Sequence, residues 1–78
     1  MSDTLVATVP KNAREEIRVV LGEFNGRQIA SARVWFEAED GSMRPGKAGL
    51  GFKIALLPAV VEALQKAEAE ARQQGLLS

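Results

Sequence analysis

The side chains with the clearest chemical potential are aromatic rings that stand beside arginines. Arg33 and Trp35 are two residues apart in a stretch that alternates like a β-strand, so they share one face of that strand. Phe24 ends the preceding alternating stretch. Rings that stack on nucleobases, together with cations that neutralise phosphates, are the parts of a surface for single-stranded nucleic acid. Further basic residues that could follow the phosphates are Arg27, Arg44 and Lys47.

Most catalytic chemistry lacks its usual residues in this chain. The sequence has no histidine and no cysteine, which removes the common general base, the thiol nucleophile and the usual ligands of zinc and iron. The reactive groups that remain are carboxylates, amines and a few hydroxyls. We therefore predict that the protein is not an enzyme and has no catalytic residue, no metal ligand and no cofactor.

Two sequence patterns that could suggest other chemistry have a simpler interpretation. The segment from Gly41 to Lys47 has the glycine and lysine spacing of a phosphate-binding P-loop, but Ala48 stands where the loop needs a magnesium-binding Ser or Thr. The residues that follow are typical of a strand and not of the required helix. Grouped acidic residues are usually solvated surface, and that is our interpretation of Glu15, Glu16, Glu37, Glu39 and Asp40.

The elements that must position these side chains are mostly strands. Residues 17–24 and 27–37 alternate between two faces, and Asn25-Gly26 between them is the strongest short signal for a hairpin. A third strand is expected over 43–51, where Pro45 and several glycines indicate an edge, a bulge or a close approach of backbones. A last strand is expected over 50–56. Residues 1–16 predict only a variable lead-in with a short extended piece.

A helix is predicted to follow the strands. Pro58 suits its first turn and Gly75 its end, and apolar residues recur between them at spacings of three and four. Glu62 with Lys66 and Glu68 with Arg72 form favourable pairs one turn apart. The predicted fold class is α+β, a curved antiparallel sheet of four strands followed by one C-terminal helix.

The direction of the aromatic side chains depends on which face of the sheet is covered. If the helix packs on the face of Ala30, Ala32 and Val34, then Arg33 and Trp35 face outward. Phe24 has the same outward parity, whereas Phe36 has the parity of the alanine face. The alternative is that these rings belong to the core, as aromatic residues often do.

The totals describe one small domain of 78 residues with a formal net charge of zero. Residues 11–53 nevertheless hold eight basic and six acidic side chains, so the sheet region is net positive and the ends are negative. A chain of this size buries only about 60% of the surface that its unfolded form exposes. Without disulfides, self-association is a physical expectation.

The sequence gives no sign of export or of membrane insertion. Leu5-Val6-Ala7 is too short an apolar run for a signal peptide, and no window approaches the length of a membrane span. The lack of cysteine fits a reducing compartment. We expect a cytoplasmic, nucleoid-associated protein without membrane contact.

Three motifs occur in an order that resembles one known family. They are Glu23-Phe24-Asn25-Gly26, Arg33-Val34-Trp35-Phe36, and Met43-Arg44-Pro45-Gly46-Lys47-Ala48-Gly49. With Leu57-Pro58 and the amphipathic helix, they resemble the transcriptional coactivator family called positive cofactor four, and Pro10-Lys11-Asn12 resembles its shorter bacterial members. The resemblance covers about residues 9–70. It divides the chain into a variable lead-in, 1–8, and a single domain of this kind, 9–78.

The resemblance implies a homodimer that is joined largely through the C-terminal helices and binds single-stranded DNA with little sequence preference. Phe24, Trp35 and Phe36 match its aromatic positions, Arg33 its central arginine, and Arg27, Arg44 and Lys47 its phosphate contacts. We expect the helix seam to be formed by Val60, Leu64, Ala67 and Ala71, whose small members allow close approach.

The role implied is transcription regulation or DNA maintenance, with the transcription machinery as a further partner. Gly22, Asn25 and Ala48 stand where eukaryotic members are often basic, which predicts weaker and more salt-sensitive binding. Two alternatives use the same face of the sheet. The chain could be a protein–protein adaptor, or it could bind RNA or partly melted duplex, because stacking surfaces do not inherently reject ribose.

Overall fold

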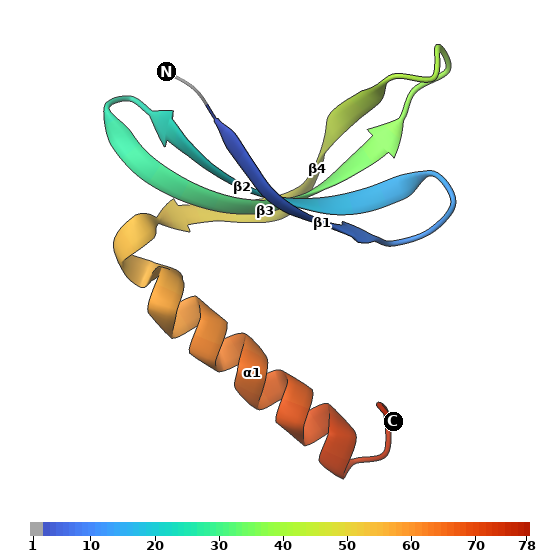
Figure 1. Ribbon diagram of the computed structural model, residues 1–78, viewed down its shortest axis with the longest axis vertical. Helices are drawn as coiled ribbons and strands as arrows, with labels where there is room; N and C mark the ends of the chain where they lie inside the picture. Colours follow the sequence, from blue (N-terminus) through green and yellow to red (C-terminus); the bar gives the residue numbers. More distant parts are fainter. Residues whose placement is uncertain (1–2) are drawn as a thin grey trace.

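The computed structural model describes residues 3–78 as one antiparallel sheet followed by a helix (Figure 1). The strands are hydrogen-bonded in the order β1-β2-β3-β4, so β1 and β4 are the edges. The predicted fold class is confirmed. The elements are β1 (Thr4–Pro10), β2 (Glu15–Phe24), β3 (Arg27–Glu37), β4 (Met43–Lys53), the short 3-10 helix η1 (Ile54–Leu56) and α1 (Leu57–Gln73).

The β2–β3 hairpin follows from its turn. Asn25 and Gly26 both have positive φ, 53° and 78°, which is what a type I′ turn requires. From this turn the two strands pair without a break between Phe24↔Arg27 and Glu15↔Phe36. The hairpin predicted from the sequence is therefore confirmed, and its register fixes which side chains share a face.

The strands at the two edges differ from the sequence expectation. The separate strands expected over 43–51 and 50–56 are one strand, β4, whose glycines bend it without ending it. The fourth strand is instead β1, within the segment where only a short extended piece was expected. Every residue of β1 is exposed, so its sequence carries no alternation of buried and exposed positions. Met1 and Ser2 lie outside the described residues.

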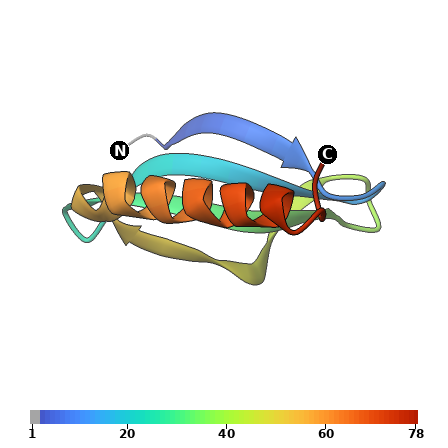
Figure 2. The ribbon, with the colours of Figure 1, turned by 90° about the horizontal axis from the view of Figure 1, so that it is seen from below.

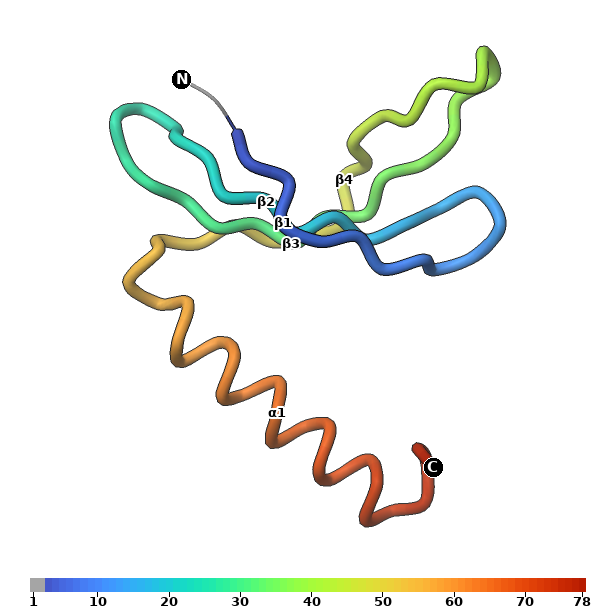
Figure 3. The backbone as a smooth tube through the Cα atoms, viewed as in Figure 1, coloured from blue at the N-terminus to red at the C-terminus, as the bar shows by residue number. Residues whose placement is uncertain are grey.

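A bulge in β4 explains its glycines. Arg33 pairs with Gly49 and Trp35 with Pro45, so the three residues Gly46, Lys47 and Ala48 face Val34 alone. Gly49 has a φ of 144°, and a Cβ there would lie 2.6 Å from both the Ala32 oxygen and the Arg33 Cα. Only glycine fits this position. The tube in Figure 3 shows the resulting irregular course of β4, in yellow-green.

The helix does not cover the sheet. Figure 1 shows α1 leaving one end of β4 through η1 and running away from the strands, and Figure 2 shows it on one side of the sheet along its whole length. The main contacts of α1 are with η1, and no residue of α1 is buried. The Cα radius of gyration is 14.5 Å, against about 11.5 Å for a compact chain of this length. The outward direction of Arg33 and Trp35 was predicted on the condition that the helix packs on the alanine face. Among residues 3–78, the helix does not pack there.

The helix itself has the predicted ends. Pro58 lies in the first turn, and no side chain caps the N-terminus. At the other end Gly75 has a φ of 79°, the Leu76 amide donates to the Ala71 oxygen at 2.8 Å, and the Gly75 amide donates to the Arg72 oxygen at 3.1 Å. This is a Schellman motif, which satisfies carbonyls that the helix leaves free. The expected pairs Glu62–Lys66 and Glu68–Arg72 form at 3.4 and 3.1 Å.

Among residues 3–78, no helix is both long enough and apolar enough to cross a membrane.

Candidate nucleic-acid interface

The sheet has two chemically different faces. Residues directly opposite each other in an antiparallel pair point to the same side. The pairs Arg18↔Arg33 and Phe24↔Arg27 therefore gather one set of side chains, and Leu21↔Ala30 gathers the other. We call the first the aromatic face: Arg18, Val20, Phe24, Arg27, Ile29, Arg33 and Trp35. We call the second the apolar face: Ile17, Val19, Leu21, Ala30, Ala32, Val34, Leu50 and Phe52.

Four of the predicted binding residues lie together on the aromatic face. Phe24 is 69% exposed at the hairpin end and Arg27 is its cross-strand partner. Arg33 and Trp35 are half-buried on the same side. The predicted opposition of Arg33 and Trp35 to the alanines is confirmed by the register. Their accessibility comes from the single-layered sheet, since no helix covers this face.

Trp35 has a close cationic neighbour that the sequence reasoning did not select. The guanidinium carbon of Arg18 lies 4.3 Å from the centroid of the indole ring. At this distance a cation is attracted by the negative face of the ring. Arg18 also pairs with Glu16, with Nε 2.5 Å from Oε2. The signal was available, because the hairpin register puts Arg18 diagonally across from Trp35.

Two shallow hollows lie beside the Trp35 and Phe24 rings on the aromatic face. One, of about 190 Å³, is lined by Asp3, Leu5, Arg18, Val20 and Trp35. The other, of about 180 Å³, reaches Phe24 and Ile29. Both hollows are lined by Asp3 and Val20, so they are neighbours on the surface between Trp35 and Phe24.

Asp3 limits the space beside Gly22, between the two hollows. A Cβ placed on Gly22 would collide with the Asp3 carboxylate. A basic side chain at position 22 would therefore require Asp3 to move. The chain has an acidic group here, where the resemblance led us to look for a cation.

Arg33 links the aromatic face to the bulge of β4. Its Nη1 donates to the carbonyl oxygen of Gly46 at 3.3 Å. Lys47 follows Gly46 and is exposed within the bulge. The bulge therefore brings a second basic residue to the strand that borders Arg33.

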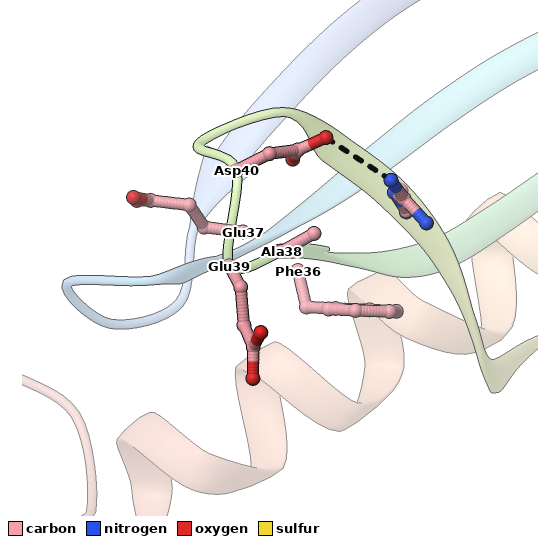
Figure 4. Close-up of a pocket in the computed structure, with 6 residues that line it drawn as sticks. Phe36, Glu37, Ala38, Glu39 and Asp40 are labelled. Atoms are coloured by element: carbon pink, nitrogen blue, oxygen red, sulfur yellow. Dashed lines mark hydrogen bonds and ion pairs between the residues drawn. The ribbon is translucent and has the colours of Figure 1, made fainter.

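Phe36 and Arg44 are not brought to the aromatic face. They oppose each other in the register and have the parity of the apolar face. The Phe36 side chain is 39% exposed and lines a hollow of about 530 Å³ with Glu37, Ala38, Glu39, Asp40 and Arg44 (Figure 4). The bulge lies in β4, and β3 runs unbroken past Trp35 and Phe36, so these neighbouring rings point to opposite sides.

Arg44 is held at the β3–β4 turn. Its Nη2 lies 3.2 Å from Oδ2 of Asp40, and its Nε donates to Oγ of Ser42 at 3.4 Å. Hydrogen bonds from the Ser42 hydroxyl and amide lower the pKa of Asp40, and the bond from Arg44 adds to this. Arg44 therefore has an internal anion as partner, whereas no ion pair joins Arg27 to another residue within 3–78.

The P-loop-like segment lies in this turn and in β4, with no helix directly after it. Among the described residues, no group of three or more His, Cys, Asp and Glu side chains could hold a metal.

The predicted dimer residues form a partly exposed stripe on α1. Val60 and Ala71 are half-buried, Ala67 is exposed, and Leu64 is 66% exposed. Leu50, on the apolar face, is 54% exposed. The chain therefore leaves large apolar side chains uncovered on both the helix and the sheet.

Comparison with known proteins agrees with this architecture. The family model of Transcriptional Coactivator p15 (PC4) matches residues 11–67. BPSL1147, a PC4 homolog from Burkholderia pseudomallei K96243, is 28% identical with a TM-score of 0.78, over 86% of this chain and 90% of that chain. MoSub1, solved in complex with single-stranded DNA, is 28% identical with a TM-score of 0.63, over 87% of this chain and 78% of that chain.

A bacteriophage T5 homolog of PC4 shares the fold, with a TM-score of 0.72 at 20% identity, over 97% of this chain and 90% of that chain. No curated protein matches the sequence. The family model spans well over half of the chain, and bacterial and phage homologues are among its structural neighbours. The chain belongs to the PC4 family of DNA-binding transcriptional coactivators.

Proposed function

We propose that this protein is a homodimer that binds single-stranded DNA on the aromatic face with little sequence preference. The observation that carries the proposal is the grouping of Phe24, Trp35 and three arginines on one side of a single-layered sheet, beside two neighbouring hollows. The single-stranded DNA bound by MoSub1 supports the same ligand class for this chain.

The charge balance requires the rings to share the binding. With a formal net charge of zero, the chain cannot hold a polyanion by bulk charge alone. Stacking of a base on an aromatic ring contributes about 1 to 3 kcal/mol and is largely indifferent to sequence. Phe24 and Trp35 would stack on bases, Arg33 would bridge base and phosphate, and Arg27 and Lys47 would contact the backbone.

The uncovered apolar surfaces support the dimer. Leu50 on the sheet and Leu64 on the helix are more than half exposed, and both are large aliphatic side chains. A second copy could cover them by packing its helix along the stripe of Val60, Leu64, Ala67 and Ala71. Burial of such area is favourable at about 25 cal/mol per Å².

The biological role that we propose is transcription regulation or DNA maintenance, in contact with the transcription machinery. A protein with this ligand would be nucleoid-associated in the cytoplasm. The family model of a transcriptional coactivator supports the first role.

A fluorescence titration tests the ligand class. Trp35 is the only tryptophan, so its emission reports on the aromatic face alone. We expect quenching by a single-stranded DNA oligonucleotide and a weaker response to its duplex. The logarithm of the affinity should fall by about 0.7 per neutralised phosphate for each tenfold rise in salt.

The same titration includes an RNA strand of the same sequence. Tighter binding of RNA than of DNA would replace DNA by RNA as the ligand. Absence of binding to either strand at low salt would contradict the proposal and would favour a protein–protein adaptor.

A further inference from the structure

Arg18 occupies an unusual position on the aromatic face. Its guanidinium lies 4.3 Å above the Trp35 ring while its Nε pairs with Glu16. The side chains of Arg18 and Glu16 are only 24% and 26% exposed, so both are held against the sheet. One face of the indole is therefore covered by a cation, and a nucleobase can stack on Trp35 only on its other face or after Arg18 moves.

Most of the donors of this guanidinium are uncommitted. Glu16 accepts from Nε, and no hydrogen bond joins either Nη atom of Arg18 to another described residue. An arginine presents five N–H donors in a planar fork that matches a carboxylate or a phosphate. Glu16 occupies the Nε edge of this fork, so a phosphate that binds Nε and Nη together in a bidentate contact must displace it.

The environment favours exchange of one anion for another. Arg18 lines the hollow that contains Trp35, so a strand that stacks on Trp35 passes within reach of its guanidinium. The exchange keeps the guanidinium paired with an anion, so its cost is the loss of the partner of Glu16, whose side chain is 26% exposed. The attraction between the guanidinium and the ring does not depend on Glu16, so Arg18 can stay over Trp35 while its anion changes.

We propose that Arg18 is a further nucleic-acid-binding residue and that Glu16 competes with the phosphate for it. This inference rests on the proposed function and adds an internal competitor to it. The carboxylate keeps Arg18 paired in the free protein and lowers the net gain from each phosphate contact, so binding stays moderate and readily reversible.

A pair of single variants tests the two roles by titration with a single-stranded DNA oligonucleotide. Arg18→Gln removes the charge and should weaken binding by about tenfold, the usual size of a lost hydrogen bond to a charged group. Its salt slope should fall by about 0.7. Glu16→Gln should instead strengthen binding by roughly two- to fivefold, the size of a partly exposed ion pair.

The helix supplies a matched control. Glu62 and Lys66 form an ion pair on α1 at 3.4 Å, away from the aromatic face. Glu62→Gln and Lys66→Gln make the same charge changes, and we expect less than a twofold effect from either. This control separates a contact at the site from a general change in net charge.

The double variant decides whether Glu16 acts through Arg18. In the Arg18→Gln background, Glu16→Gln should no longer strengthen binding, because the competitor has lost its target. Arg18→Lys should restore the salt slope but not the full affinity, since an ammonium lacks the planar fork. The emission of unliganded Trp35 should change in Arg18→Gln, and far-ultraviolet circular dichroism should not.

Several results would overturn the inference while the proposed function stands. In the first, the wild-type protein binds the single strand and Arg18→Gln has the same affinity and the same salt slope. In the second, Glu16→Gln strengthens binding even in the Arg18→Gln background. If the wild-type protein itself does not bind the single strand, both proposals fall. The wild-type titration therefore distinguishes the two failures.

Discussion

Within residues 3–78 no second layer covers either face of the sheet, yet the two faces differ in their chemistry. The aromatic face combines Phe24 and Trp35 with Arg18, Arg27 and Arg33, whereas the residues that define the apolar face are aliphatic except for Phe52. A sheet covered by its own helix would need only one apolar face. A single layer with two unlike faces can take two partners, and the proposed ones fit this chemistry: a polyanion whose bases stack for one face, and the apolar surface of a second copy for the other.

Phe36 marks the limit of this division. It follows Trp35 directly in β3 and therefore belongs to the opposite side, beside Arg44 and the acidic turn. A strand of nucleic acid that contacts both rings must pass around the β3–β4 hairpin. Phe36 is therefore the residue at which the separation between the two faces can be tested.

The largest expected effect concerns the apolar surfaces. Leu64→Glu puts a charge into the predicted helix seam, and an unpaired charge buried at an interface costs about 3 to 5 kcal/mol. We expect the dimer to dissociate to monomers at micromolar concentration, measured by sedimentation. Gln65→Glu, one residue along the helix, should remain dimeric. A dimeric Leu64→Glu protein would exclude this stripe as the seam.

The next effect concerns the aromatic face. Trp35→Ala removes one stacking surface and should weaken binding of single-stranded DNA by roughly 5- to 150-fold, because stacking contributes about 1 to 3 kcal/mol per base. Binding is followed by anisotropy of a labelled oligonucleotide, since the variant has no tryptophan. Trp35→Phe, which keeps a ring, should recover most of the affinity. Equal binding by all three proteins would exclude Trp35 as a contact.

A smaller effect is expected at Phe36. Phe36→Ala should weaken binding by less than Trp35→Ala, since the Phe36 ring lies on the side of the sheet opposite the aromatic face. The same anisotropy titration measures both. If Phe36→Ala loses as much affinity as Trp35→Ala, the bound DNA strand must wrap around the β3–β4 hairpin. The binding surface would then include residues on both sides of the sheet near Glu37.

The basic residues should act mainly through salt dependence. Arg27→Gln and Lys47→Gln each remove one phosphate contact, so each should lower the salt slope by about 0.7 and weaken binding alike for different sequences. Lys66→Gln on α1 is the matched control. A change in sequence preference without a change in slope would assign these residues to base contacts instead.

Local signals in the sequence predicted the parts of the fold that local chemistry determines. Asn25-Gly26 set the hairpin and its register, and Gly75 ended the helix. The bulge that keeps β4 continuous depends on how closely it approaches β3, which no window of sequence contains. The exposed strand β1 has no buried side to produce alternation.

The candidate site was likewise predicted only in the part that local sequence patterns determine. The parity of Phe24, Arg33 and Trp35 followed from alternation alone, and the register confirms it. The stack of Arg18 on Trp35 requires the register and the side-chain conformation together, so composition and spacing did not select it. The position of the helix could not be predicted from the sequence of one chain. Among the described residues no side chain of α1 is buried, so no packing partner fixes where the helix lies.

The smallest effect concerns pH at the β3–β4 turn, where Phe36 and Arg44 meet. The pKa of Asp40 is lowered chiefly by hydrogen bonds from Ser42. A carboxyl whose pKa is lower in the folded state stabilises that state above its unfolded pKa, and this contribution disappears as pH falls through the folded pKa. Asp40→Asn should therefore show a smaller fall in Tm on acidification than the wild-type protein, measured by circular dichroism.

Glu39→Gln is the neighbouring control, because the Glu39 side chain makes no hydrogen bond or ion pair with the described residues, and it should follow the wild-type profile. Since the Asp40 side chain is 61% exposed, the effect should be modest. The substitution Asp40→Asn should also leave the affinity at the aromatic face unchanged at neutral pH, because Asp40 lies in the β3–β4 turn and Arg44 has the parity of the apolar face. A change in affinity would mean that releasing Arg44 from Asp40 adds a phosphate contact, and the hairpin would then belong to the binding surface.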